Sequence, residues 1–246
     1  KYLIVIRELL KESQTNIPDF LDESIFYLGK AYNLLCAKRK NGILFNGNFE
    51  DSNKEFDEYL NLNKYKFKDD ANELGGYIVL KNKKTSLVID FGKAPEKIFS
   101  KDYQAGLFSF EFSYLGEKVI TNSGYFQDYK HQLNIISKST ATHSTLILNN
   151  TSAVKFVRNK YGNMIVSKSF KIFNKEINSE KNFWLLKASH DAYSKSNGVI
   201  HERQIQYFHD DCKLKGCDKL IKTKNFNSTR FELRFHLLPE INLTKL

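Results

Sequence analysis

The sequence has little of several features that mark common classes of protein. Only three prolines occur among 246 residues, so no proline-rich linker divides the chain. No apolar run approaches the roughly 20 residues that a membrane-spanning helix needs. The chain opens on Lys1 without a signal peptide and stops without a clear terminus signal. We therefore expect a fragment of a longer protein, with any targeting signal upstream of it.

Cysteine is also scarce. Cys212 and Cys217 lie close enough in sequence to close a hairpin as a disulfide in an oxidising compartment, and Cys36 lies in a helical pattern typical of a buried thiol. No pair of cysteines or histidines has zinc-finger spacing, which argues against a structural zinc site of that kind.

Several functional motifs are missing. No G-x-S-x-G occurs, so the nucleophile elbow of serine hydrolases is absent. No P-loop or G-x-G-x-x-G occurs, which argues against nucleotide binding. Aromatic residues lie beside basic ones, but neither an RNP-like nor a helix-turn-helix pattern is present, so we expect no nucleic-acid partner.

Positive charge is in excess. Lys and Arg number 38 against 28 Asp and Glu, a formal net charge of +10. Such a surface favours a polyanion: nucleic acid, an anionic membrane or an acidic polysaccharide. A lysine-rich surface without any such partner is an equally good explanation at this point.

Residues 1–40 show helical spacing of apolar side chains with a break before Pro18. We expect two helices, the second starting at Pro18 or Asp19 and ending in the basic run 38–40. Two helices cannot bury both apolar faces, so further helices upstream are expected. Residues 41–74 are predicted to form a segment that connects the helices to the sandwich. It is expected to contain a short strand and turn over 42–49 and weak helical spacing within 50–72.

The chain is organised around residues 102–148. Aromatic side chains occupy every second position from Phe108 to Tyr114, the period of a strand with one buried face. A tight turn at 115–117 leads into a second strand, and a third is expected to open on His143. Polar side chains at these strand ends can converge although they are far apart in sequence.

Other stretches extend the strand pattern, and none of them has a helical period. They are 77–80 and 86–90, joined by a hairpin turn at 82–84, and then 164–173, 183–188, 199–208 and 229–237. The predicted fold is mainly β: a large antiparallel β-sandwich of about ten or more strands over 75–246, preceded by a short two-helix segment.

His143 is the leading candidate for chemistry. Small hydroxyl residues flank it in S-T-A-T-H-S-T, so we expect its ring to be reached from solvent, where it can transfer a proton near neutral pH. The alternative is a partly buried histidine bonded to a backbone carbonyl.

A second group lies at another loop–strand junction. His190, His201 and Arg203 are candidate substrate-binding residues, because a guanidinium can grip a carboxylate or sulfate with two hydrogen bonds. The alternative is a surface salt bridge from Arg203 to Glu202 or a neighbour, which is the commoner case.

Eight stretches, collinear along nearly the whole chain, together resemble the heparinase II/III-like family of polysaccharide lyases. They are G-I-L-F-N-G, S-L-V-I-D-F-G, Q-A-G-L-F-S-F-E-F-S, V-I-T-N-S-G, S-T-A-T-H-S-T-L, A-S-H-D-A-Y, G-V-I-H-E-R-Q-I and R-F-H-L-L-P. The resemblance implies an α/α toroid followed by a β-sandwich, with substrate in the cleft between them. Residues 1–40 would then end the toroid.

The resemblance also implies an activity and a site. The family cleaves uronic-acid-containing glycans by β-elimination. Its H-A-H-A-[DG]-x-L-S-F motif supplies a catalytic His and a zinc-binding His, where this chain has Asp102 and Gln104. Its next zinc ligand is an Asp, here Asn122, and its last is kept as His143. An amide is a poor zinc ligand, so we predict a degraded zinc site, no metal and no cofactor.

Two functions follow from the resemblance. In the first, the protein is a metal-free lyase whose catalytic residues here are His143, Asp102, Gln104 and Asn122, with a Tyr and an Asn or His on the missing toroid; this fragment alone is then inactive. In the second, the sandwich only binds acidic glycan or supports the toroid structurally. The predicted partners are an acidic polysaccharide and that toroid, in the periplasm or outside the cell if the full protein has a signal peptide.

Overall fold

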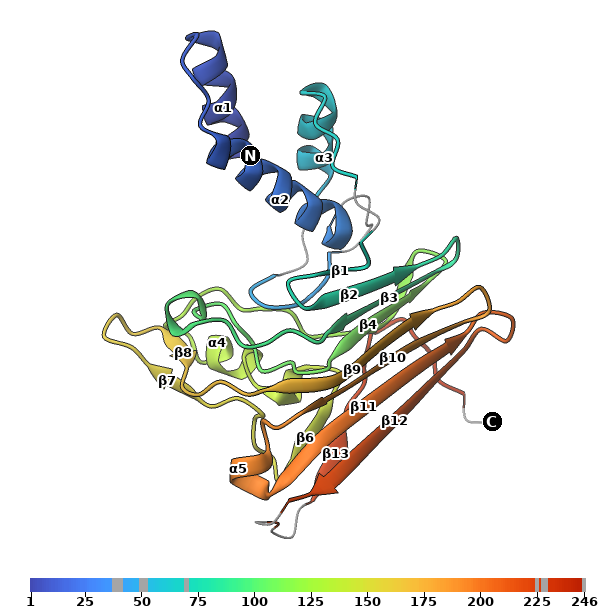
Figure 1. Ribbon diagram of the computed structural model, residues 1–246. Coiled ribbons are helices and arrows are strands. Elements are labelled where there is room, and N and C mark those ends of the chain that lie inside the picture. The colour runs from blue at the N-terminus through green and yellow to red at the C-terminus, as the bar shows by residue number, and fades with distance from the viewer. Residues whose placement is uncertain (37–41, 49–52, 69–70, 224–225, 227–229, 245–246) are drawn as a thin grey trace.

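The computed structural model describes residues 1–36, 42–48, 53–68, 71–223, 226 and 230–244. Three helices lie together above one side of a two-layered β structure (Figure 1). They are α1 (Tyr2–Glu12), α2 (Asp19–Leu35) and α3 (Lys54–Leu62). Their contact is a small apolar cluster centred on Ile4, Leu21, Ile25 and Leu60. None of the described helices has the length and apolar character needed to cross a membrane.

The first large sheet has the strand order β1-β2-β3-β4-β5-β14 and the second has β12-β11-β10-β9. All pairings are antiparallel. The strands of the first are β1 (Glu73–Leu74), β2 (Tyr77–Lys81), β3 (Thr85–Asp90), β4 (Phe110–Tyr114), β5 (Glu117–Thr121) and β14 (His236–Leu237). Those of the second are β9 (Ile172–Ser179), β10 (Phe183–His190), β11 (Val199–Phe208) and β12 (Lys213–Lys222).

Two smaller pairings complete the β structure, β6 (Leu146–Leu148) with β13 (Phe231–Leu233) and β7 (Phe156–Arg158) with β8 (Met164–Val166). Short helices lie between strands at α4 (Gln132–Ser137), α5 (Ser194–Asn197), η1 (Lys97–Phe99) and η2 (Thr140–Thr142). The two large sheets face each other across one apolar core, to which β3 and β4 contribute Leu87, Ile89, Phe110 and Phe112, and β10 and β11 contribute Trp184, Leu186 and Ile205. The predicted mainly β, antiparallel sandwich is confirmed.

The helical predictions for residues 1–40 hold for the described part. Pro18 is extended (ψ 137°) and caps α2, which starts at Asp19. The helix ends at Leu35, and the basic run 38–40 lies outside the described residues. The strand expected over 42–49 is wrong: residues 42–48 pair with no strand and form a turn at 46–47. Their apolar side chains are buried against β2 and β3 instead.

Four strand predictions need correction. The predicted strand 164–173 is split between β8 and the start of β9, which belong to different sheets. β4 begins at Phe110 because Phe108 adopts a left-handed conformation (φ 58°), although its ring still enters the core. The third strand begins at Leu146, three residues after His143. The predicted strand 229–237 is split into β13 and β14, which belong to different sheets, and 227–229 lie outside the described residues.

Two kinds of element were missed. β12 was read only as a hairpin around C-K-L-K-G-C, because its lysines hide the alternation of Leu214, Asp218 and Leu220 toward the interior. α4 and α5 are too short to give a helical period. Cys212 lies before β12 and Cys217 on it, and the two are exposed and not disulfide-bonded.

A buried ion pair fixes segment 42–48 to the first sheet. Lys118 Nζ lies 3.0 Å from Glu111 Oε2, and the two side chains are only 5% and 3% exposed. Glu111 Oε1 accepts a hydrogen bond from the Leu44 backbone N–H (2.9 Å), and Lys118 donates to the Gly42 carbonyl. The pair therefore joins β4 and β5 to the segment that carries the site described below.

We expect Glu111→Gln to destabilise the protein by about 3–5 kcal/mol, because it leaves the Lys118 ammonium buried without a counter-charge. The amide oxygen can still accept the hydrogen bond from the Leu44 N–H, so the loss of stability measures the effect of removing the negative charge. The free energy of unfolding in urea measures it. The control is Glu111→Leu with Lys118→Met, which removes both charges and should recover most of the loss. A Glu111→Gln protein as stable as the unaltered chain would contradict the prediction.

Candidate functional site

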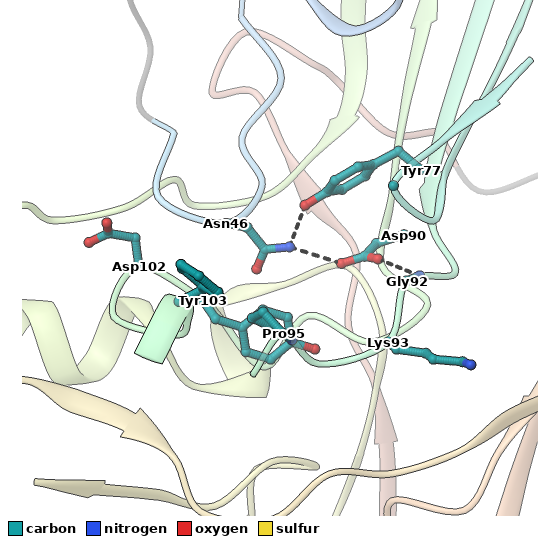
Figure 2. Close-up of a pocket in the computed structure, with 10 residues that line it drawn as sticks. Asn46, Tyr77, Asp90, Gly92, Lys93, Pro95, Asp102 and Tyr103 are labelled. Atoms are coloured by element: carbon teal, nitrogen blue, oxygen red, sulfur yellow. Dashed lines mark hydrogen bonds between the residues drawn. The ribbon is translucent and has the colours of Figure 1, made fainter. Parts of the chain in front are cut away.

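A cavity of about 220 Å³ opens where segment 42–48 meets the first sheet (Figure 2). Asn46 reaches it from that segment, Tyr77 from the start of β2, and Asp90 from the end of β3. We call it the junction cavity. It is lined by Asn46, Gly75, Tyr77, Asp90, Gly92, Lys93, Pro95, Phe99, Asp102 and Tyr103.

The local chain geometry explains why these side chains meet. Tyr77 and Asp90 are paired residues across the β2–β3 hairpin. Gly76 precedes β2 with φ 89°, and a Cβ there would lie 2.2 Å from the Gly92 Cα. Only glycine permits that approach of the two backbones, so the cavity floor depends on the glycines beside the paired strand ends.

One amide connects the polar groups of the cavity. Figure 2 shows Asn46 Nδ2 pointing between the Tyr77 hydroxyl and Asp90, and it donates to both, at 3.2 Å to Asp90 Oδ2. The Gly92 backbone N–H donates to Asp90 Oδ1 (2.8 Å). The Tyr77 hydroxyl accepts from Asn46, and its own proton is left to donate elsewhere.

Burial changes the acid–base character of this cavity. It raises the pKa of Asp90 to about 7, an effect that the hydrogen bonds from Gly92 and Asn46 partly oppose. Burial, together with the nearby Asp90, also raises the pKa of Tyr77. At neutral pH the cavity therefore holds a phenol that keeps its proton and a carboxyl group that exchanges one.

Asp102 lies at the rim and is exposed. Its Oδ1 accepts a hydrogen bond from the Tyr125 hydroxyl (3.1 Å). Of the four residues predicted to be catalytic, Asp102 is the one whose side chain reaches solvent in this structure.

Gln104 is buried behind the cavity and joins three parts of the chain. Its Nε2 donates to the carbonyls of Gly124 (2.9 Å) and Ser137 (2.6 Å), and its Oε1 accepts from the Gly47 N–H (3.3 Å). Its own backbone N–H donates to Asn46 Oδ1 (2.9 Å). Gln104 thus holds the turn that carries Asn46 into the cavity.

His143 and Asn122 are also buried, each 1% exposed. His143 Nδ1 donates to the Ser139 carbonyl (2.8 Å), and burial lowers the pKa of the ring to about 4. The expectation that solvent reaches this ring is wrong, because Gly106 packs so closely that a Cβ there would lie 2.5 Å from the imidazole. Asn122 Oδ1 accepts from the Ser144 N–H (2.9 Å).

The residues at the three positions that the resemblance gives to zinc do not fit that metal. The Gln104 amide and the Asn122 oxygen are engaged with the backbone, and His143 Nδ1 carries a proton, which leaves one imidazole nitrogen as a ligand. No described group of three or more His, Cys, Asp or Glu is placed to hold a metal. The absence of zinc remains a prediction that direct metal analysis can test.

The second predicted group is an interior network. His190 Nε2 lies 3.0 Å from His201 Nδ1, and His201 Nε2 lies 2.6 Å from Asp218 Oδ1. Arg203 makes two hydrogen bonds to Asp218, at 2.7 and 3.1 Å. Burial lowers the pKa of both histidines, while the hydrogen bond from His201 and the charge of Arg203 hold the pKa of Asp218 down, at about 2, against the opposing effect of its burial.

This placement corrects the reading of His190, His201 and Arg203 as surface groups. Each is at most 1% exposed. Arg203 pairs with Asp218 on β12, whereas Glu202 pairs with Lys187 and Lys219 instead. Their polar atoms form hydrogen bonds with one another and with Asp218 inside the sandwich.

Reasoning from the sequence missed Asn46, Tyr77, Asp90 and Asp218. A weak signal existed for two of them: Asn46 directly precedes a glycine, and Asp90 ends an apolar run two residues before another. Such a pattern is typical of a polar side chain set at a strand end or turn. Tyr77 lies opposite Asp90 in the predicted hairpin 77–90, but nothing in the sequence marked it as functional. Asp218 gave no signal, because β12, which places it opposite Arg203, was not predicted as a strand.

Comparison with known proteins agrees with this fold. Residues 68–246 match the family described as heparinase II/III-like, C-terminal. The chain belongs to this family. No curated protein matches it.

Solved structures share the fold of this heparinase II/III-like chain at low identity. Heparan sulfate lyase HepC from Pedobacter heparinus has a TM-score of 0.62 and 16% identity over 89% of this chain and 36% of its own. Heparinase III, the BT4657 gene product, has a TM-score of 0.64 and 15% identity; the match covers 84% of this chain and 33% of that one. A further heparinase III has a TM-score of 0.60 and 15% identity, and the match covers 88% of this chain and 38% of that one. This chain spans about a third of the length of those lyases.

We expect the Asp90 carboxyl group to titrate near pH 7, and Asn46→Ala to raise its pKa further, because the lost hydrogen bond favours the charged form. Carbon-13 NMR of the side-chain carboxyl groups measures both values. Asn182→Ala, in the β9–β10 turn, is the matched control and should leave Asp90 unchanged. An Asp90 pKa near its ordinary value would contradict this description of the cavity.

The buried neutral His143 also predicts loss of stability in acid. The unfolded ring binds a proton below its ordinary pKa of 6.5, whereas the folded ring resists until about pH 4. Stability from this residue is complete above pH 6.5 and falls by about 3 kcal/mol by pH 4. Urea unfolding of the chain and of His143→Gln should show their difference shifting by that amount over this range. A pH-independent difference would contradict the buried placement.

Proposed function

We propose that this chain forms one wall of the substrate cleft of a lyase that cleaves uronic-acid-containing glycans by β-elimination. The observation that carries the proposal is the junction cavity, in which an exchangeable carboxyl group, a protonated phenol and an exposed carboxylate lie together (Figure 2). Membership of the heparinase II/III-like family supports it.

The cavity residues suit two parts of β-elimination: stabilisation of the developing charge and protonation of the leaving oxygen. A base removes the proton α to the uronate carboxylate, the negative charge is stabilised on that carboxylate, and the C4–O bond breaks. Tyr77 can donate its proton to the leaving oxygen, since its raised pKa keeps it protonated. Asp90, when protonated, can donate a hydrogen bond to the uronate carboxylate.

The remaining roles divide by exposure. Asp102, at the rim, can contact the sugar. Gln104, Asn122 and His143 lie behind the wall, and we assign them positioning roles because each holds backbone rather than opening to the cavity. The base that abstracts the proton is expected from the helical wall of the cleft, which the family resemblance places upstream of this chain.

A non-catalytic glycan-binding module is the second candidate. The burial of His143 favours it, because the one histidine expected in catalysis is removed from any substrate. In that case the cavity binds a sugar residue and no bond is broken.

The test uses the protein extended upstream through its helical region. Ultraviolet absorbance of the unsaturated product is followed with a panel of uronate glycans, and we expect elimination with at least one. Tyr77→Phe should lower kcat on the order of 100-fold, the usual worth of a positioned proton donor. Asn182→Ala is the control and should keep full activity.

Other outcomes separate the two candidates. Glycan binding without any rise in absorbance supports the binding module. Full activity in Tyr77→Phe would remove that residue from the mechanism, while the chain of 246 residues alone is expected to give no product.

A further inference from the structure

One end of the sandwich carries an excess of positive charge, although Asp191 Oδ1 accepts a hydrogen bond from the Lys171 backbone N–H (2.7 Å). The loop 92–101 contains three lysines and one glutamate, and residues 153–171, which include the β7–β8 hairpin, contain four lysines, one arginine and no acidic residue. All of these cations are exposed: Lys93, Lys97, Lys101, Lys155, Arg158, Lys160, Lys168 and Lys171.

The two segments lie side by side in the fold (Figure 1). The Val166 backbone N–H on β8 donates to Ser100 Oγ (3.0 Å), directly after η1. Tyr103, Val154 and Phe170 pack together beneath them in one apolar cluster. The backbones that carry these charges are therefore packed side by side on one surface.

A hollow of about 550 Å³ runs between the two segments. Lys93 and Ala94 line it from the loop, and residues 169–173 line it from the approach to β9. We call it the basic groove. Lys93 also lines the junction cavity, so the two hollows adjoin at this side chain.

Charge elsewhere on the protein is balanced differently. On the outer face of the second sheet, Glu202 lies 3.5 Å from both Lys187 and Lys219. Among the described residues, no carboxylate forms an ion pair with Lys93 or Lys171. Unpaired cations facing a common hollow suit an anionic ligand.

We propose that the basic groove binds the anionic groups of a glycan chain next to the sugar residue held in the junction cavity. Lys93 stands between the two positions, and Lys171 lines the far side of the groove. Phe99 is 72% exposed at the rim of the junction cavity and offers a flat apolar ring to a sugar face. The inference rests on the proposed function, because it takes the junction cavity as part of the glycan site.

A glycan is favoured over nucleic acid by the neighbouring cavity. Asn46, Asp90 and Asp102 there present amide and carboxyl groups, which can hydrogen-bond the many hydroxyl groups of a glycan. The lysines are point charges that can face either sulfate or carboxylate.

The test measures binding by the whole chain. Fluorescence anisotropy follows a labelled heparan-type oligosaccharide in sulfated form and the same backbone without sulfate. Lys93→Gln with Lys171→Gln should weaken binding on the order of 10-fold, since two charge-assisted contacts are lost, and should flatten its salt dependence. Lys83→Gln with Lys84→Gln, in the exposed β2–β3 turn, removes the same charge and should change binding little.

Equal binding by the Lys93/Lys171 variant and the unaltered chain would overturn the inference. Equal losses in both double variants would also overturn it, because they show only a net-charge effect. A single-stranded oligonucleotide that binds as tightly, with the same variant dependence, would replace it with general polyanion binding.

The two sugar probes identify the anion, since loss confined to the sulfated form assigns sulfate and loss in both assigns carboxylate. Binding without elimination by the extended protein leaves this groove standing and removes the lyase activity. Elimination at an unchanged KM in the Lys93/Lys171 variant supports the lyase activity and overturns the groove.

Discussion

The buried guanidinium of Arg203 is the constraint on which the sandwich depends. A charge that is 1% exposed must find acceptors for its protons. It finds them in Asp218 within its own sheet and, through Nη1, in the carbonyls of Phe108 (2.9 Å) and Ser144 (3.0 Å). The Phe108 N–H in turn donates to the Asp90 carbonyl, and the Ser144 N–H to Asn122. The second sheet thereby fixes the backbone beneath the candidate site in the first.

Between that backbone and the junction cavity, side-chain amides connect the loops by hydrogen bonds. Gln104 binds the carbonyls of Gly124 and Ser137 and the N–H of Gly47, and Asn46 then holds Tyr77 and Asp90. An amide can do this because it donates and accepts at once. The positions that the family resemblance gives to metal ligands thus serve here as cross-links between loops. The cavity is positioned by hydrogen bonds whose partners are mostly backbone, so its geometry depends on the course of the chain.

The sequence predicted the elements that a local pattern of apolar residues or a proline marks. The alternation at Phe110 and Phe112 predicted the strand β4, and Pro18 predicted the start of α2. The expectation of only one buried face is wrong for β4, because Glu111 on the opposite face is buried as well. It could not show that His143 is buried, because small hydroxyl neighbours occur both on surfaces and beside satisfied backbone. Nor could it separate Arg203 at a surface from Arg203 in a core, since its partner Asp218 lies on a strand whose lysines conceal its period. Packing between segments far apart in sequence decides these cases: Gly106 against His143, and Arg203 against the Phe108 and Ser144 carbonyls. A single sequence does not show such packing.

The distribution of charge bears on the two explanations of the +10 net charge. A lysine-rich surface without a partner should spread its cations, and pairs such as Glu202 with Lys187 and Lys219 show that this chain can balance them. Residues 153–171 instead carry five cations and no acid, beside a loop that carries three more. Repulsion among like charges fixed on one surface costs stability. A surface that accepts that cost next to a polar cavity is better explained by an anionic ligand than by composition alone.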